Sequence, residues 1–187
     1  MDVFEQVCTP ERGIDRRTLE DVIVLAVEVA REGREGRKVG TLFTVGDAES
    51  VLERSHALIL DPLLGHPSAL KRISRPDMRE TIKELAQLDG AFVVSDDGVV
   101  ISACRYLNAS AEGVRLPLGL GSRHVAAASI TLQTQAVAVV VSESSVVRVF
   151  DNGELISEII PELWMLRHYR PHLSGPYSQT AMSTLRW

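Results

Sequence analysis

Apolar residues recur at helical spacing in two stretches of the chain. Residues three and four positions apart share one face of a helix, so such spacing predicts an amphipathic helix. The first runs from Asp15, a suitable N-cap, to about Arg34, where "GREGRK" ends it. The second opens at Pro76 and Asp77. The apolar faces consist of Leu19, Val22, Ile23, Ala26, Val29 and Ala30 in the first and Met78, Ile82, Leu85 and Ala86 in the second.

Short apolar runs predict the strands. "VGTLFTVG" (39–46) is rich in β-branched residues, and "HALIL" (56–60) is expected to be a short buried strand. "GAFVVS" and "VVISACRYL" flank "DDG", which is typical of a β-hairpin. "AVAVVVS" (136–142) is apolar on both faces and therefore predicts a central strand. "VVRVF", the turn "DNG" and "ELISEI" complete a β-ribbon.

This order of elements predicts an α/β fold, a three-layer domain with a central twisted mixed β-sheet flanked by helices. A helix of small residues is expected from about Arg123 to Thr134, after a loop with Pro117 and three glycines. We expect residues 1–160 to form the domain. Residues 161–187, which contain both tryptophans and three prolines, are expected to be a C-terminal tail docked on it rather than a nucleic-acid site.

Composition narrows the class of protein. The 187 residues are 45% hydrophobic and 24% charged, as in a soluble globular domain. The net charge of -5 disfavours a general nucleic-acid surface, so no DNA partner is expected. Cys8 and Cys104 are too few for a disulfide framework, which favours a reducing cytoplasm. The chain shows neither a membrane-spanning stretch nor a signal-peptide pattern, so we expect a cytoplasmic protein without a membrane partner.

Several common motifs are missing from the sequence. There is no phosphate-binding loop of the G-x-x-x-x-G-K-[ST] type, no G-x-S-x-G elbow and no H-E-x-x-H. Gly119 and Gly121 begin a G-x-G, but His124 stands where a dinucleotide fingerprint needs its third glycine. His168 and His172 are four residues apart, yet Pro171 between them disfavours a helical metal pair.

The stretch "LGLGSRHVAA" (118–127) places polar groups where the small-residue helix begins. A helix N-terminus presents unpaired backbone N–H groups and a positive dipole end. Ser122 suits the N-cap, Gly121 lets a ligand approach the backbone, and Arg123 and His124 add donors that match phosphate oxygens. The stretch predicts a phosphate cradle. The alternative is an ordinary Ser-capped helix whose arginine and histidine are solvated.

Two further polar positions stand next to apolar strands. Asp89 precedes Gly90 and Ala91, which are too small to block access to its carboxylate. It could hold a divalent metal or polarise a hydroxyl, or it could be a turn residue that binds nearby backbone N–H groups. Ser142 and Glu143 follow the central strand, where open α/β sheets bind ligands, although a polar turn explains them as well.

Taken in order, these stretches resemble the diadenylate cyclase family, also called the DAC or DisA_N domain. Its signatures are an Asp-Gly-Ala motif and a G-[TS]-R-H-R-x-A motif. Here they are Asp89-Gly90-Ala91 and the six residues Gly121, Ser122, Arg123, His124, Val125 and Ala126. The hairpin between them and the valine strand after them also fit, and the resemblance spans about residues 15 to 160.

The resemblance implies an enzyme that condenses two ATP molecules into cyclic di-AMP and releases two pyrophosphates. Each protomer of a face-to-face homodimer, or of a higher homo-oligomer, would hold one ATP. Asp89 would bind Mg²⁺ or Mn²⁺ and help to activate the 3′-hydroxyl, with Glu143 as a second metal ligand. Residues 121–126 and Ser142 would contact the nucleotide, Ser122, Arg123 and His124 would grip its triphosphate, and Leu107 lies where the family contacts adenine.

One position departs from the family pattern. Val125 stands where the family usually has a second arginine. Losing such a charge-assisted hydrogen bond removes about 1.5–3 kcal/mol of binding free energy. Arg105 or Arg115 could substitute, or the chain could be a catalytically weak adenine-nucleotide-binding regulatory domain.

Overall fold

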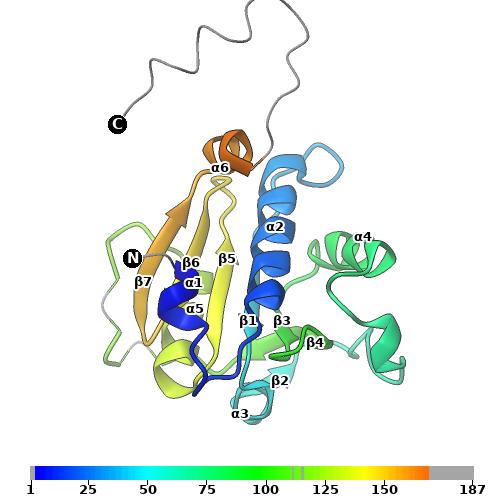
Figure 1. Ribbon diagram of the computed structural model, residues 1–187, viewed down its shortest axis with the longest axis horizontal. Helices are drawn as coiled ribbons and strands as arrows, with labels where there is room; N and C mark the ends of the chain where they lie inside the picture. The colour runs from blue at the N-terminus through cyan, green and yellow to red at the C-terminus, as the bar shows by residue number, and fades with distance from the viewer. Residues whose placement is uncertain (1–2, 111, 115, 169–187) are drawn as a thin grey trace, which may run out of the picture.

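The computed structural model describes residues 3–110, 112–114 and 116–168. Its strands form one sheet of seven in the order β2-β4-β3-β1-β5-β6-β7 (Figure 1). The pair β1–β3 is parallel and the other five pairs of the described sheet are antiparallel, so the sheet is mixed, as predicted. The strands are β1 Thr41–Val45, β2 Ser55–Ala57, β3 Ala91–Val94, β4 Val100–Leu107, β5 Val137–Val141, β6 Val147–Asp151 and β7 Glu154–Ile159.

Helices cover both faces of the sheet and make the three expected layers. Side chains alternate between the faces of a strand, so Phe43 packs in one core cluster with α2 and α4, while its neighbour Leu42 packs in a second cluster with α3 and α5. No helix within the described residues is long and apolar enough to span a bilayer. The helices are α1 Val3–Val7, α2 Arg16–Glu32, α3 Ala48–Glu53, α4 Pro76–Leu85, α5 Ser122–Gln133 and α6 Pro161–His168, with a 3₁₀ turn at Ser68–Leu70.

The helix ends show which local predictions were right. Asp15 caps α2, because its carboxylate accepts a hydrogen bond from the backbone N of Arg17 at 2.8 Å, and Gly33 ends the helix with φ of 59°. Ser122 is not the cap of α5. Gly121 takes that place in an extended conformation, and Ser122 is the first helical residue. No side chain caps this helix, so its first N–H groups lack the acceptor that a serine cap would supply.

The prediction of a buried strand at "HALIL" was wrong. Only its first two residues belong to a strand, β2, which lies at the edge of the sheet, and Leu60 is 94% exposed. A short apolar run does not by itself reveal whether a second strand or a helix covers it. Helix α3 was not predicted at all, because its six residues are too few to show a helical period.

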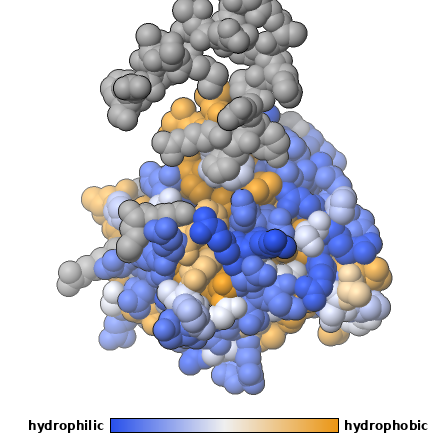
Figure 2. Space-filling view, viewed as in Figure 1, coloured by the Kyte–Doolittle hydropathy of each residue, from blue (hydrophilic) through white to orange (hydrophobic). Residues whose placement is uncertain are grey.

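The segment after the sheet starts with α6. Trp164 and Met165 of this helix pack against the core cluster beneath α2. Figure 2 shows apolar surface over α6, where Leu163 and Leu166 are more than half exposed. Residues 169–187, including His172, lie outside the described residues, so a docked tail stays a prediction.

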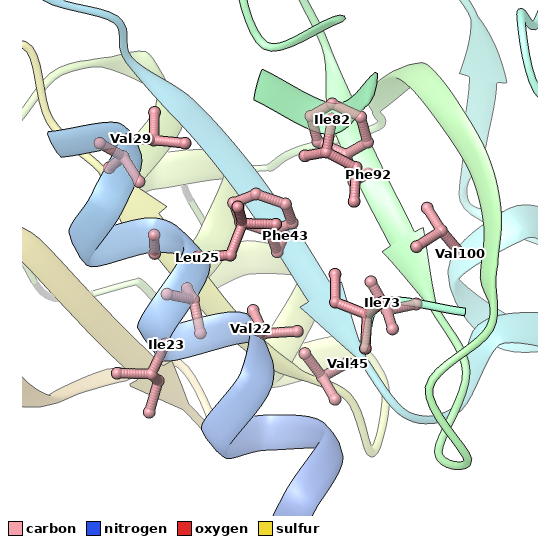
Figure 3. Packing of buried hydrophobic residues seen from close by; sticks show 14 of the residues in the cluster. Val22, Ile23, Leu25, Val29, Phe43, Val45, Ile73, Ile82, Phe92 and Val100 are labelled. Carbon is pink, nitrogen blue, oxygen red and sulfur yellow. The ribbon is translucent and has the colours of Figure 1, made fainter. Parts of the chain in front are cut away.

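An aromatic stack lies at the centre of the larger core cluster. Phe43 of β1 is fully buried between α2 and Phe92 of β3, with the ring centroids 5.1 Å apart (Figure 3). We expect Phe43→Ala to lower the free energy of unfolding by about 3–5 kcal/mol, because it leaves a cavity between a strand and a helix. Denaturant titration measures this loss. In Leu60→Ala, which truncates an exposed apolar side chain, the change should stay within about 0.5 kcal/mol.

Candidate active site

Three segments of the chain meet at one end of the central strands, which is the edge of the sheet meant below. The pairing of β1 with β3 and β5 brings them there. Leu42 of β1 aligns in parallel with Ala91 at the start of β3, and Thr41 aligns antiparallel with Val141 at the end of β5. The residues just before β1 and β3 and those just after β5 therefore lie at the same edge. That edge brings together Gly40, Asp89 and Glu143, which are distant in sequence.

Arg123, in the first turn of α5, lies between two carboxylates. Its Nη2 is 3.8 Å from Asp89 Oδ1, and its Nη1 is 3.2 Å from Glu143 Oε1. A Cβ on Gly40 would lie 2.8 Å from Arg123 Nη1, so the glycine provides the space for the guanidinium. Sequence reasoning missed Gly40, although a glycine directly before a buried strand is a signal of close approach.

Asp89 is held outward by a backbone constraint on its neighbour. Gly90 has φ of 108°, and a Cβ there would lie 2.6 Å from the carbonyl carbon of Cys104. Only glycine fits, since both the conformation and the contact exclude a side chain. Asp89 accepts a hydrogen bond from the Gly90 backbone N at 3.0 Å, and its side chain stays 84% exposed. The Asp-Gly pair thus directs a carboxylate into solvent just before the start of β3.

Next to Asp89 lies a mostly apolar pocket of about 370 Å³, which we call the β3–β4 pocket. It contains eight of the predicted site residues: Asp89, Gly90, Ala91, Leu107, Ser122, Arg123, Val125 and Ala126. Sequence reasoning did not assign Leu42, Leu58 and Tyr106 to this pocket. Leu42 belongs to the adjoining strand β1, Leu58 to a loop, and Tyr106 alternates along β4 with the predicted Leu107. An apolar wall of this kind suits a flat, uncharged group such as a nucleobase.

A second hollow of about 280 Å³ lies beyond Arg123, and we call it the helix-end hollow. It contains the other predicted residues, Gly121, His124, Ser142 and Glu143, and shares Ser122 and Arg123 with the β3–β4 pocket. It also contains Arg148 of β6, which sequence reasoning did not single out. The structure thus distributes the predicted site over two adjoining hollows.

His124 is buried and contacts an arginine. Its Nε2 lies 3.3 Å from Arg148 Nη1, and its ring packs edge-on against Phe150. Burial, together with the Arg148 guanidinium, lowers the pKa of His124 below its ordinary value. The neutral ring therefore accepts from Arg148, while its buried Nδ1 has no hydrogen-bond partner among the described residues. Donation from His124 to a phosphate stays a prediction.

The two arginines considered as substitutes at Val125 have different outcomes. Arg105 lines the β3–β4 pocket, and its guanidinium donates hydrogen bonds to the Ser55 hydroxyl and to the carbonyls of Leu52 and Ser55. Its role as a substitute stays a prediction. Arg115 lies outside the described residues.

Two carboxylates at this edge could supply part of the ligand set of a divalent metal. The described residues contain no group of three or more histidine, cysteine or acidic side chains able to hold an ion. Asp89 and Glu143 supply two carboxylates on either side of Arg123. Mg²⁺ is commonly bound by one or two carboxylates plus phosphate oxygens, so this pair is a suitable partial ligand set.

The lowered pKa of His124 predicts a pH-dependent stability. The unfolded chain takes up a proton near pH 6.5, whereas the folded chain resists it, so the free energy of unfolding should fall as pH drops below about 6.5. In His124→Asn this fall between pH 7.5 and 5.5 should be shallower, as measured by denaturant titration at each pH. Replacement of the exposed His66 serves as the control. An equal slope in wild type and His124→Asn would contradict the assignment.

Comparison with known proteins shows the family to which the chain is similar. A family model described as DisA bacterial checkpoint controller nucleotide-binding matches residues 28–155. A diadenylate cyclase of Methanocaldococcus jannaschii is 48% identical over 147 residues, which cover 78% of this chain and 46% of that protein. A diadenylate cyclase of Haloferax volcanii is 44% identical over 151 residues, with 80% and 55% covered. The chain spans about half the length of these curated relatives.

Solved structures agree in fold. A protein from Bacillus cereus described as a hypothetical membrane spanning protein has a TM-score of 0.55 at 19% identity, covering 74% of this chain and 61% of that one. A double mutant of Staphylococcus aureus DacA has a TM-score of 0.52 at 21% identity, covering 82% and 95%. The fold, the match over residues 28–155 and the identity to two diadenylate cyclases establish that this chain belongs to the DAC family.

Proposed function

We propose that this chain condenses two ATP molecules into cyclic di-AMP and releases two pyrophosphates. The observation that carries the proposal is that Asp89 and Arg123 line the same β3–β4 pocket. The exposed Asp89 carboxylate lies 3.8 Å from the guanidinium of Arg123 at the N-terminus of α5. Relatives with 44–48% identity are named diadenylate cyclases, which supports the same activity.

The nucleoside fits the β3–β4 pocket. Leu42, Leu58 and Leu107 offer apolar surface for adenine, and the half-exposed Tyr106 lies at the same pocket. Val125 and Ala126 form the wall on the α5 side, where bulkier side chains would narrow the pocket. The α-phosphate then lies at Ser122 and Arg123, where the free N–H groups of the helix and the guanidinium neutralise its charge.

The reaction needs a second copy of the chain. The 3′-oxygen of one ATP forms a bond to the α-phosphorus of the other, the bond from that phosphorus to the bridging oxygen breaks, and pyrophosphate leaves with the electron pair. Asp89 accepts the hydroxyl proton or directs its loss. One pocket holds one ATP, so ring closure requires two pockets face to face. The exposed apolar side chains of Leu58 and Tyr106 at the pocket support coverage of this face by a second protomer.

Asp89 and Glu143 would hold the Mg²⁺ or Mn²⁺ that accompanies the nucleotide. Such an ion neutralises phosphate charge when bound. The chain itself supplies alignment, because Arg123 contacts both carboxylates and lines both hollows.

A product assay tests the proposal. We expect the purified chain, incubated with ATP and Mn²⁺ or Mg²⁺, to form cyclic di-AMP and pyrophosphate in a 1:2 ratio by chromatography. Nucleotide binding without any dinucleotide product, across both metals and a range of pH, would instead identify a regulatory nucleotide-binding domain. Val125, which contributes no charge at the first turn of α5, is the feature that favours this second function.

Asp89→Asn should abolish turnover without unfolding the protein. The side chain is exposed and its amide still accepts the Gly90 N–H, so the melting temperature should hold, while product formation falls at least about 100-fold. Asp96→Asn is the matched control, because Asp96 is an exposed aspartate at the opposite end of β3. Normal turnover by Asp89→Asn would refute the role of this carboxylate.

A further inference from the structure

Arg148 is a charged residue on the apolar face of a strand. Alternation along β6 places Val147 and Val149 in the core under α2, while Phe150 packs in the cluster under α5. Arg148 shares the parity of Phe150 and therefore faces α5. Its side chain is only 13% exposed. A guanidinium in such a place needs a polar environment, and the helix-end hollow supplies it.

Two contacts fix the orientation of this guanidinium. Nε donates to Glu158 Oε1 of β7 at 2.8 Å, and Nη1 lies 3.3 Å from the accepting Nε2 of His124. The third nitrogen, Nη2, makes no hydrogen bond within residues 3–110, 112–114 and 116–168, and the residue lines the helix-end hollow. The group is thus held by one carboxylate and one neutral ring, with donors left for a ligand.

The helix-end hollow favours a polyanion. Two guanidinium groups, Arg123 and Arg148, lie on it, and Glu143 is the carboxylate among its lining residues. The neutral His124 adds no charge. A Cβ at Gly119 or Gly121 would meet nothing within 4 Å, so the loop leaves open space before the helix N-terminus. The wall of this hollow is about as polar as it is apolar, and its two guanidinium groups suit phosphate groups better than a nucleobase.

The path of a triphosphate follows from where the two hollows meet. They share Ser122 and Arg123, and the β3–β4 pocket is the apolar one. If the nucleoside occupies that pocket, the α-phosphate lies at the shared residues and the outer phosphates continue into the helix-end hollow. We propose that Arg148 binds the β- and γ-phosphates of ATP and retains the leaving pyrophosphate. This inference rests on the proposed function for the reaction, but not for the binding.

The experiment compares ligands with and without outer phosphates. Binding of 3′-deoxy-ATP, which cannot react, of AMP and of inorganic pyrophosphate is measured by calorimetry for wild type and Arg148→Met. We expect the variant to lose about tenfold or more in affinity for 3′-deoxy-ATP and pyrophosphate, while AMP changes less than about twofold. Equal losses for AMP, or no loss for the other two ligands, would overturn the proposal.

Two control variants separate binding from folding. Arg79→Met removes another partly buried arginine paired with a glutamate, Glu28, on the α2–α4 face, and should leave all three affinities unchanged. Glu158→Gln removes the charge partner of Arg148 but keeps an accepting oxygen, so its losses should be smaller than those of Arg148→Met. If Arg148→Met does not fold, Arg148→Lys is measured in its place. Lysine keeps the positive charge but lacks the forked N–H donors of the guanidinium. A preferential loss for 3′-deoxy-ATP over AMP supports the proposal, and an equal effect contradicts it.

The outcomes also distinguish this inference from the proposed function. If the wild-type chain forms no cyclic di-AMP, the proposed activity is refuted. If Arg148→Met nevertheless loses the preference of the wild type for 3′-deoxy-ATP over AMP, the phosphate site is supported. A chain that forms cyclic di-AMP with the same ATP and pyrophosphate affinities in the variant would keep the activity and refute the site.

Discussion

Strand β1 is the constraint on which the site depends. It runs parallel to β3 and antiparallel to β5, so the segments before β1 and β3 and after β5 end at one edge of the sheet. Helix α5 packs on the face of β5 and β6 and places its N-terminus at the same edge. If β5 ran the other way, Glu143 would be carried to the far edge, and Arg123 would lose one of its two carboxylates. The fully buried, valine-rich β5 stabilises this arrangement, since every residue of the strand is enclosed between two layers.

Glycines and small residues provide the space that the site requires. Gly40 makes room for the Arg123 guanidinium, and Gly90 lets β3 start against the backbone of Cys104 while Asp89 points outward. Ala127 and Ala128 are fully buried, so α5 packs closely against the sheet beside the pocket. At the two glycines an added Cβ would clash with neighbouring atoms, and at the two buried alanines a larger side chain would push the helix away from the sheet.

The ion pairs at the site are suited to exchange. Asp89 and Glu143 are 84% and 70% exposed where they meet Arg123, and exposed pairs contribute only about 0–1 kcal/mol. A phosphate that displaces a carboxylate from Arg123 therefore encounters little opposition. Arg148 differs, because it is largely buried and fixed by Glu158 and His124. One arginine can change partners while the other is held in place, which would suit the proposed alignment of a triphosphate and release of pyrophosphate.

The sequence alone determined the elements whose signals are local. The Asp15 cap, the period of α2, the "DDG" hairpin and the doubly apolar β5 each depend on neighbouring residues, and the structure contains all of them. The two motifs also sufficed to expect Asp89 and Arg123 in one site, and they share a pocket. Tertiary structure decided what depends on which strands are neighbours. Strand β2 lies at the edge of the sheet and ends at Ala57, and Leu60 lies exposed in the loop that follows. The β5–β6 pairing brought Arg148 to His124 and divided the predicted residues between two hollows. The reason is physical: periodicity reports which face of an element is apolar, but the partner of that face is set by packing between segments far apart in the chain.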